Sequence, residues 1–266
     1  MKQYAYVQLD PTGNLTDLVT EPVPAEDEPR VTEELMKDCE QVAYLEPARQ
    51  GGRARIRLMG GEFCGNAAIA AACYLVRDEL QPGEEALVPL EVSGAEGVLP
   101  CRVKRLADGF EGTVPMPKVI SIQRETWGGL QMAAVRMEGI LHMICEEPLD
   151  SDEAAERLLR EIASAVPDEA VGLIQWKAGT MRPLVYVRGS DTMVWETGCG
   201  SGSAAVGAWE AVRRGGLVQT MVKQPGGIIR VEAQAKKGNV CKLSITGLVR
   251  IGRSDRAFDE GGKKEV

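Results

Sequence analysis

Two short segments of the sequence repeat a cysteine followed by a glycine and a small polar residue. They are CGN at 64–66 and CGS at 199–201, 135 residues apart, and each continues into an alanine-rich run. Alanine is the best helix former, so we expect each cysteine to precede a buried helix. The N–H groups of a helix start bind carboxylates and lower the pKa of a nearby thiol. Each segment therefore predicts a thiol poised beside an anion site.

Two such thiols suit inversion at a carbon that carries an acidic proton. Two helix starts that face each other would hold one substrate carboxylate, with a thiol on either side of the adjacent carbon. One thiolate then removes the Cα proton, and the opposite thiol delivers a proton to the other face. The helix N–H groups stabilise the charge that builds on the carboxylate. We predict that Cys64 and Cys199 are catalytic, with no metal and no cofactor.

A lone cysteine is more often a small buried hydrophobe, but two copies at matching positions favour chemistry. Four other cysteines lack this context and are interpreted as structural: Cys73, Cys101, Cys145 and Cys241.

The elements that must position these thiols follow the same repeat. We predict helices over 64–77 and 199–213, each followed by a strand, a glycine turn and a strand, at 90–103 and 222–234. The turn Gly226-Gly227 is interpreted as a hairpin and stays outside the predicted site. Two further helices are expected at 31–38 and 151–166, the latter from its Ser/Asp cap and helical spacing.

The predicted fold class is α+β, with two pseudo-symmetric lobes. Each lobe is a curved, mostly antiparallel sheet wrapped round a central helix. The N-terminal lobe covers 1–122 and the C-terminal lobe 123–245, and a strand at about 246–258 returns to the first lobe. The tail, 259–266, is expected to be disordered.

Composition narrows the function classes. The 266 residues are 44% hydrophobic with a net charge of −8, and no basic stripe indicates a nucleic-acid partner. No apolar run is long enough for a membrane span, and the N-terminus lacks the apolar core of a signal peptide. Seven scattered cysteines, no CxxC pair and a single histidine argue against a disulfide scaffold or a structural zinc site. We expect a reduced, cytoplasmic protein.

The chain resembles the diaminopimelate epimerase superfamily over most of its length. CGN at 64–66 and CGSG at 199–202 look like that family's two catalytic motifs. The resemblance implies two pseudo-symmetric α/β domains with the active site in the cleft between them. It also implies that His142 and Glu196 tune the thiol pKa values. The substrate-binding residues that we predict are Asn14, Gln41, Gly65, Asn66, Gly200 and Ser201.

Departures from the family pattern concern the substrate. Where diaminopimelate epimerases carry polar groups that grip the far end of diaminopimelate, this chain has 59–63 (MGGEF), 139–142 (GILH) and the short loop 195–198 (WETG). The sequence is most similar to the branch with the histidine racemases of metallophore pathways. That similarity implies a pyridoxal-phosphate-independent racemase that converts L-histidine to D-histidine, so the expected partner is a small molecule, an amino acid. By resemblance a homodimer is expected.

Other functions stay open on the sequence alone. They are a diaminopimelate epimerase, a non-racemase isomerase of the same fold, a thiol redox sensor with a Cys64–Cys199 disulfide, and a non-enzymatic binding protein.

Overall fold

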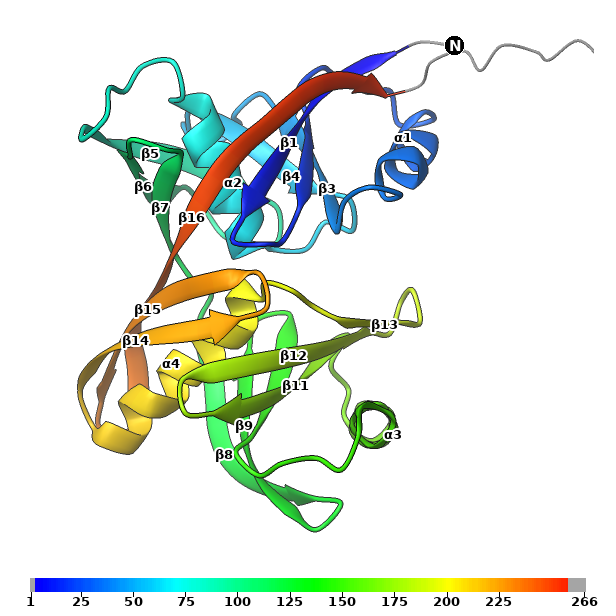
Figure 1. Ribbon diagram of the computed structural model, residues 1–266, viewed down its shortest axis with the longest axis vertical. Coiled ribbons are helices and arrows are strands. Elements are labelled where there is room, and N and C mark those ends of the chain that lie inside the picture. Colours follow the sequence, from blue (N-terminus) through cyan, green and yellow to red (C-terminus); the bar gives the residue numbers. More distant parts are fainter. Residues whose placement is uncertain (1–2, 258–266) are drawn as a thin grey trace, which may run out of the picture. The chain divides into compact units, whose positions relative to one another are not determined.

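The protein is an α+β chain built largely of strands, which confirms the predicted class (Figure 1). The computed structural model describes residues 3–257, so the tail at 259–266 lies outside the described residues. The chain divides into two compact units. Unit 1 comprises the described residues up to Gly112 and those from Leu248 onward, and unit 2 comprises Thr113–Gly247. The sequence analysis placed the corresponding division after residue 122.

Unit 1 contains a mixed sheet. Its strands are β1 (Tyr4–Pro11), β2 (Thr16–Val19), β3 (Gln41–Glu46), β4 (Ala54–Leu58), β5 (Glu85–Val92), β6 (Leu99–Arg105), the start of β7 (Phe110–Pro115) and the end of β16 (Asn239–Ala257). They follow one another in numerical order from β1 to β7, and β16 also pairs with β1. The β2–β3 and β4–β5 pairs are parallel, whereas β1–β2, β3–β4, β5–β6 and β1–β16 are antiparallel.

The buried helix of unit 1 is α2 (Gly65–Leu75), which begins directly after Cys64 as the sequence predicts. All residues from Gly65 to Cys73 are buried, and the helix packs against β6, β1 and β5. Its alanines keep it thin, so strands approach closely. A Cβ on Gly112 of β7 would lie only 2.4 Å from Cγ2 of Ile69, so this strand needs glycine there.

The first helix, α1 (Glu28–Leu35), begins three residues before the range expected at 31–38. A proline at the start of the helix explains the difference, because its fixed φ suits the first turn and its missing N–H has no helical partner to lose. Val31 and Leu35 of α1 join Tyr4, Val42 and Tyr44 in a small core.

Unit 2 contains a second mixed sheet. Its strands are β8 (Val119–Trp127), β9 (Leu130–Met137), β10 (Ile140–Cys145), β11 (Ala170–Lys177), β12 (Thr180–Val187), β13 (Thr192–Trp195), β14 (Leu217–Gln224), β15 (Gly227–Lys236) and the start of β16. The order is β8–β9–β10–β11–β12–β14–β15–β16, and β13 pairs with β12. The antiparallel β14–β15 hairpin is the predicted strand–turn–strand at 222–234.

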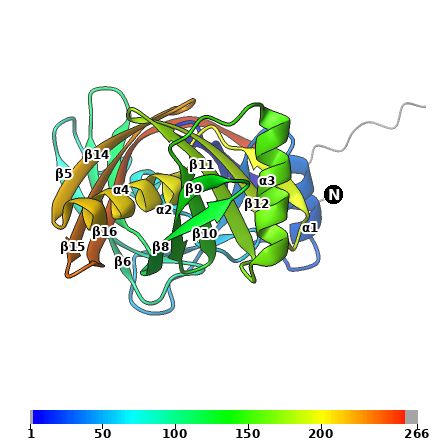
Figure 2. The same cartoon turned by 90° about the horizontal axis from the view of Figure 1, so that it is seen from below.

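The two helices of unit 2 also match the predicted ranges. The buried helix α4 (Gly200–Arg214) runs beside β14 and β15 (Figure 2), so close that a Cβ on Gly207 would lie 2.4 Å from Cγ1 of Val231. The peripheral helix α3 (Asp152–Ala165) packs on β11 and β12, and the Ser151 hydroxyl caps it by accepting the Ala154 N–H at 3.2 Å. Within residues 3–257, no helix combines the length and apolarity needed to cross a bilayer.

Candidate active site

Cys199 is the N-cap of α4, and its sulfur caps the helix. The residue is extended, with φ −105° and ψ 106°, and the Gly202 N–H donates to its Sγ at 3.2 Å. The side chain is almost fully buried, at 3% exposure. Gly202 is required for this approach, because a Cβ there would lie 2.9 Å from Cδ1 of Ile174 and 3.1 Å from the sulfur itself.

The expectation that the helix start lowers the pKa of this thiol is wrong for Cys199. Burial raises the pKa of Cys199 well above its usual value, and the charge of Glu196 and a hydrogen bond with it raise it further. Hydrogen bonds from Ser201 and the Gly202 N–H lower the pKa, as the helix start predicts, but they do not outweigh burial. Cys199 is therefore a neutral thiol in the free protein.

Ser201 and His142 extend this site inward. Oγ of Ser201 lies 3.5 Å from Sγ of Cys199 and 3.0 Å from Nε2 of His142, so the hydroxyl bridges the thiol and the imidazole. His142 lies in β10 and is fully buried, and burial lowers its pKa to about 3. Its ring is therefore neutral, and its Nδ1 has no hydrogen-bond partner among the described residues.

Gly172 makes room for the His142 ring. The two residues are register partners in the parallel β10–β11 pair, and a Cβ on Gly172 would lie 2.3 Å from Nδ1 of His142. Gly172 was not predicted from the sequence as part of the site. The available signal was a glycine in the middle of an apolar strand, which often marks a close approach.

Cys64 occupies the corresponding position in unit 1. It is the N-cap of α2, extended at φ −131° and ψ 116°, but its sulfur caps no N–H of the helix. The residue is half-buried, and Sγ lies 4.0 Å from Oδ1 of Asn14. This thiol therefore lies beside the carboxamide of Asn14.

Asn14 and Gln41 form a buried network beside Cys64. Nε2 of Gln41 donates to Oδ1 of Asn14 at 2.7 Å and to Oγ of Thr16 at 2.8 Å, and Nδ2 of Asn14 donates to Glu40 at 2.7 Å. Both amide protons of Gln41 are thereby used. Its Oε1 takes part in neither of these bonds and is the acceptor atom of the side chain.

Each unit thus assembles its own predicted residues. In unit 1, Asn14 and Gln41 meet near Cys64, and Gly65 and Asn66 are the first two residues of α2. In unit 2, the structure brings together Cys199, Glu196, Ser201 and His142, with Gly200 as the first residue of α4.

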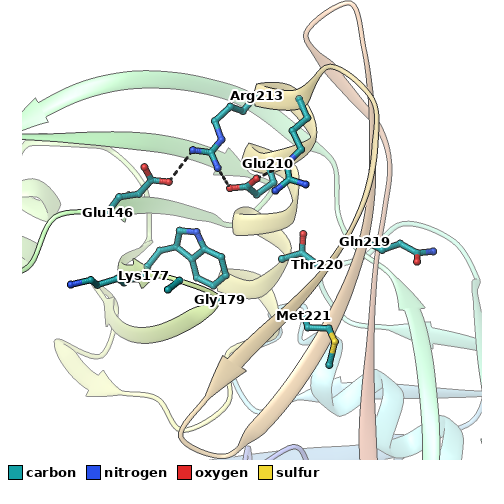
Figure 3. A pocket seen from close by; sticks show the side chains of 11 residues that line it. Glu146, Lys177, Gly179, Glu210, Arg213, Gln219, Thr220 and Met221 are labelled. Carbon is teal, nitrogen blue, oxygen red and sulfur yellow. Dashed lines mark hydrogen bonds and ion pairs between the residues drawn. The ribbon is translucent and has the colours of Figure 1, made fainter.

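A hollow of about 550 Å³ on unit 2 contains none of these residues (Figure 3). Both of its carboxylates are held in ion pairs with arginines. The buried carboxylate of Glu210 pairs with Arg213 and Arg214, and Arg213 also pairs with Glu146 at 3.4 Å. We interpret these ion pairs as stabilising the last turn of α4, where cations complement the helix dipole.

Solved structures with this fold include a predicted epimerase and a hydroxyproline epimerase. A predicted epimerase from Pseudomonas aeruginosa superposes with a TM-score of 0.70 at 16% identity, covering 97% of this chain and 100% of that chain. A hydroxyproline epimerase from Agrobacterium vitis gives a TM-score of 0.69 at 16% identity, covering 96% of this chain and 92% of that chain. The protein therefore has the fold of the racemase and epimerase class.

The family is narrower than the fold. The chain belongs to the family described as the histidine racemase CntK N-terminal domain, whose model matches residues 3–258. It is similar to the histidine racemase of Fusobacterium nucleatum, at 27% identity over 236 residues, covering 84% of this chain and 86% of the relative. It is also similar to the histidine racemase of Staphylococcus aureus, at 24% identity over 269 residues, covering 96% and 97%. The resemblance recognised in the sequence is confirmed.

Proposed function

We propose that this protein is a histidine racemase that interconverts L- and D-histidine by a two-cysteine mechanism. The observation that carries the proposal is a cysteine at the N-cap of the one buried helix in each described unit. The family match and the two relatives named as histidine racemases support the substrate. Their alignments span most of both chains, so the comparison concerns the whole protein.

The proposed chemistry requires one base and one acid on opposite faces of the substrate Cα. The Cys199 thiol, whose pKa is raised by burial, carries a proton in the free protein and acts as the acid. Cys64, as a thiolate, acts as the base for the enantiomer that it faces. The Cα–H bond breaks toward the Cys64 sulfur, and the Cys199 S–H proton forms the new bond on the other face. The opposite enantiomer reverses these roles, so atoms and charges balance.

The groups around Cys199 suit a sulfur that changes its protonation state. Glu196 favours the thiol, whereas Ser201 and the Gly202 N–H favour the thiolate. We assign the neutral His142 as the Nε2–H tautomer. Its N–H then donates to Oγ of Ser201, and the hydroxyl proton is directed to the sulfur. This hydrogen-bond chain stabilises the thiolate whenever Cys199 has given up its proton.

The carboxamides of unit 1 suit recognition of the amino-acid head group. Oε1 of Gln41 is a fixed acceptor, because Asn14 and Thr16 hold its Nε2. We propose that it accepts a hydrogen bond from the substrate ammonium group. The first N–H groups of α2 and α4, at Gly65, Asn66, Gly200 and Ser201, are proposed to bind the carboxylate.

We also propose that the two units are pseudo-symmetric lobes. Each has a cysteine-capped buried helix, followed by an antiparallel hairpin of β5–β6 or β14–β15. A cytoplasmic location is proposed from the seven free cysteines, which suit a reducing compartment.

A chiral assay of L-histidine and LL-diaminopimelate, at matched concentrations and with no added cofactor, tests the function. We expect inversion of histidine and poor turnover of diaminopimelate, because a second charged head group would lack a partner. Faster epimerisation of diaminopimelate would contradict the proposal. Inversion of another single-headed amino acid, with histidine inert, would remove only the substrate assignment.

The mechanism is tested separately with Cys64→Ala and Cys199→Ala. Each variant should lose racemisation, while Cys241→Ala, which removes an exposed thiol on β16, serves as the matched control and should retain it. Near-wild-type turnover by Cys64→Ala or Cys199→Ala would rule out the two-cysteine scheme.

A further inference from the structure

The turn between β14 and β15 contacts the backbone of Cys199. Gln224 ends β14 and precedes the Pro225-Gly226 turn, a segment that the sequence analysis left outside the site. Its side chain is only 8% exposed. Oε1 of Gln224 accepts the N–H of Cys199 at 2.6 Å, which is a short bond for this kind of pair. A buried polar side chain therefore satisfies the peptide N–H of a proposed catalytic residue.

Ser203 closes a ring of hydrogen bonds around the same peptide group. Nε2 of Gln224 donates to Oγ of Ser203 at 3.0 Å, and that hydroxyl donates to the carbonyl oxygen of Cys199 at 2.7 Å. Ser203 is fully buried. Side chains thus bond both the N–H and the C=O of Cys199. The carboxamide of Gln224 bonds the N–H directly and reaches the C=O through the Ser203 hydroxyl.

The same turn also holds the loop that leads to Cys199. The Gly226 N–H donates to the carbonyl oxygen of Thr197 at 2.8 Å. Two successive parts of the hairpin therefore fix residues 197 and 199, directly before α4 begins.

This restraint acts on the position of the sulfur. An N-cap residue has non-helical φ and ψ, and only its C=O is bonded into the helix, here by the Ser203 N–H at 3.1 Å, so its N–H side needs another restraint. A change in φ or ψ of Cys199 moves its Sγ away from the Gly202 N–H, now at 3.2 Å, and from Oγ of Ser201, now at 3.5 Å. Proton transfer depends steeply on such distances, and misplacement of about 1 Å costs on the order of 10²-fold in rate.

We infer that Gln224, acting with Ser203, is a positioning residue that holds the Cys199 thiol in its reactive geometry. This inference rests on the proposed function for its kinetic readouts, but its chemical readout is independent of any substrate. Glutamine suits the role because one planar group both accepts from an N–H and donates to a hydroxyl. Glutamate only accepts when ionised, and methionine does neither well.

Unit 1 has a related contact that supports this reading. The turn after β5 brings Oγ of Ser93 to the carbonyl oxygen of Glu62 at 2.8 Å, and a Cβ on Gly94 would lie 2.3 Å from the Phe63 nitrogen. In both units the hairpin turn that follows the buried helix holds the loop before the cysteine. In unit 2 the turn also bonds the cysteine itself, through Gln224.

The test uses the full-length protein with Gln224→Met, Gln224→Glu and Ser203→Ala. Gln219→Met is the matched control, because Gln219 is an exposed glutamine on the same strand that bonds only Glu232 at 3.2 Å. For each folded variant we would measure kcat, KM, the pH profile and the rate at which iodoacetamide alkylates Cys199, identified by peptide mass spectrometry.

We expect Gln224→Met and Ser203→Ala to lower kcat at least about tenfold with KM changed by less than about threefold. The alkylation rate of Cys199 should change in both variants, and Cys64 should react as in the wild type. Gln224→Glu adds a carboxylate beside the thiol, so its alkylation should slow and its pH profile should move to higher pH. The Gln219→Met control should match the wild type in every readout.

A purely structural role gives different results. In that case the variants lower the melting temperature, but kcat per folded molecule, the pH profile and Cys199 alkylation stay at wild-type values, and the inference is overturned. Failure of all three variants to fold would equally assign these residues to stability alone. If no amino acid is racemised, the proposed function fails, and unchanged Cys199 alkylation in Gln224→Met would still overturn the inference by itself.

Discussion

Cys64 and Cys199 begin comparable helices but lie in different chemical surroundings. Cys199 is buried, and its sulfur contacts a helix N–H, a serine hydroxyl linked to a neutral imidazole, and a glutamate. Cys64 is half-buried and lies near the carboxamide of Asn14. A repeated sequence motif thus gives two thiols that differ in burial and in the polar groups recorded beside them.

A racemase does not need matching thiols. The two enantiomers of free histidine have equal free energies, so kcat/KM must be the same in both directions for the wild type and for every variant. Differences between the two half-sites therefore appear in kcat and KM separately, in pH profiles and in proton exchange. They do not appear in the ratio of the two kcat/KM values.

The largest expected effect separates the two thiols by the enantiomer that each one faces. Cys64→Ala and Cys199→Ala should each lower racemisation by about 10³-fold or more, as loss of a general acid or base does. Each variant should still exchange the Cα proton for deuterium in D₂O with one enantiomer, and the two variants should prefer opposite enantiomers. NMR measures this exchange. If both variants exchange the proton of the same enantiomer, the two thiols do not face opposite enantiomers.

A smaller effect is expected where unit 2 makes room for His142. Gly172→Ala places a Cβ against the imidazole, where it would lie 2.3 Å from Nδ1, so the ring or the strand must shift. We expect a loss of about 1–3 kcal/mol in the free energy of unfolding and a loss of activity of about tenfold. Gly216→Ala is the control, because nothing lies within 4 Å of its added Cβ. Chemical denaturation measures the effect on stability, and the chiral assay measures the effect on activity. An unchanged kcat would show that the position of His142 does not matter for the reaction.

Glu196→Gln tests what sets the acidity of Cys199. The substitution removes the charge of Glu196, which raises the pKa of Cys199, so that pKa should fall. Alkylation of Cys199 by iodoacetamide near neutral pH should accelerate at least about threefold, because the thiolate is the reactive form. The reactivity of Cys64 should stay the same. A slower reaction at Cys199 would show that Glu196 does not act on its sulfur in this way.

The smallest effect on activity is expected at the buried acid of unit 1, Asp17. Burial raises its pKa from 3.8 to about 6, although hydrogen bonds with Gln8 and Cys39 lower it, and its Oδ1 has no partner among the described residues. The folded protein holds this proton more tightly than the unfolded chain. The stability that protonation provides is present below about pH 4 and is lost as the pH rises through about 6.

Asp17→Asn removes that ionisation. The variant should therefore be more stable than the wild type at pH 7–8, by on the order of 2 kcal/mol, and the difference should disappear near pH 4. Racemisation should be unchanged, in contrast to substitutions at His142. Thermal unfolding at several pH values measures the difference, and a gain that persists at low pH would contradict the assignment.

The sequence identified the elements better than the contacts between them. The start of α3 was predictable because the Ser151 cap and the helical spacing are local, and the alanine runs after the cysteines predicted α2 and α4. The pKa of Cys199 was not predictable, because a helix start is visible in the sequence and the depth of burial is not.

Side-chain direction was also beyond the sequence. Ser201 was predicted to bind substrate, and for its N–H this role stays a prediction. Its hydroxyl, however, lies between Cys199 and a histidine on β10. Gln224 resembled an ordinary hairpin residue, since its partner Cys199 lies 25 residues earlier in the chain. Both contacts depend on strands that meet only in the folded protein.

The path of β16 has a consequence for how the protein is made. Residues Thr113–Gly247 form one continuous compact unit, whereas unit 1 needs the end of β16, which pairs with β1 from Pro11↔Val249 to Tyr4↔Ala257. On the ribosome, a chain emerges from its N-terminus at about 5–20 residues per second. Strand β1 must therefore wait for β16, with its edge unpaired on that side until the segment after Thr113–Gly247 has been synthesised. Chaperone binding to nascent chains is accordingly expected to concentrate on the N-terminal segment, although unit 2 is synthesised later.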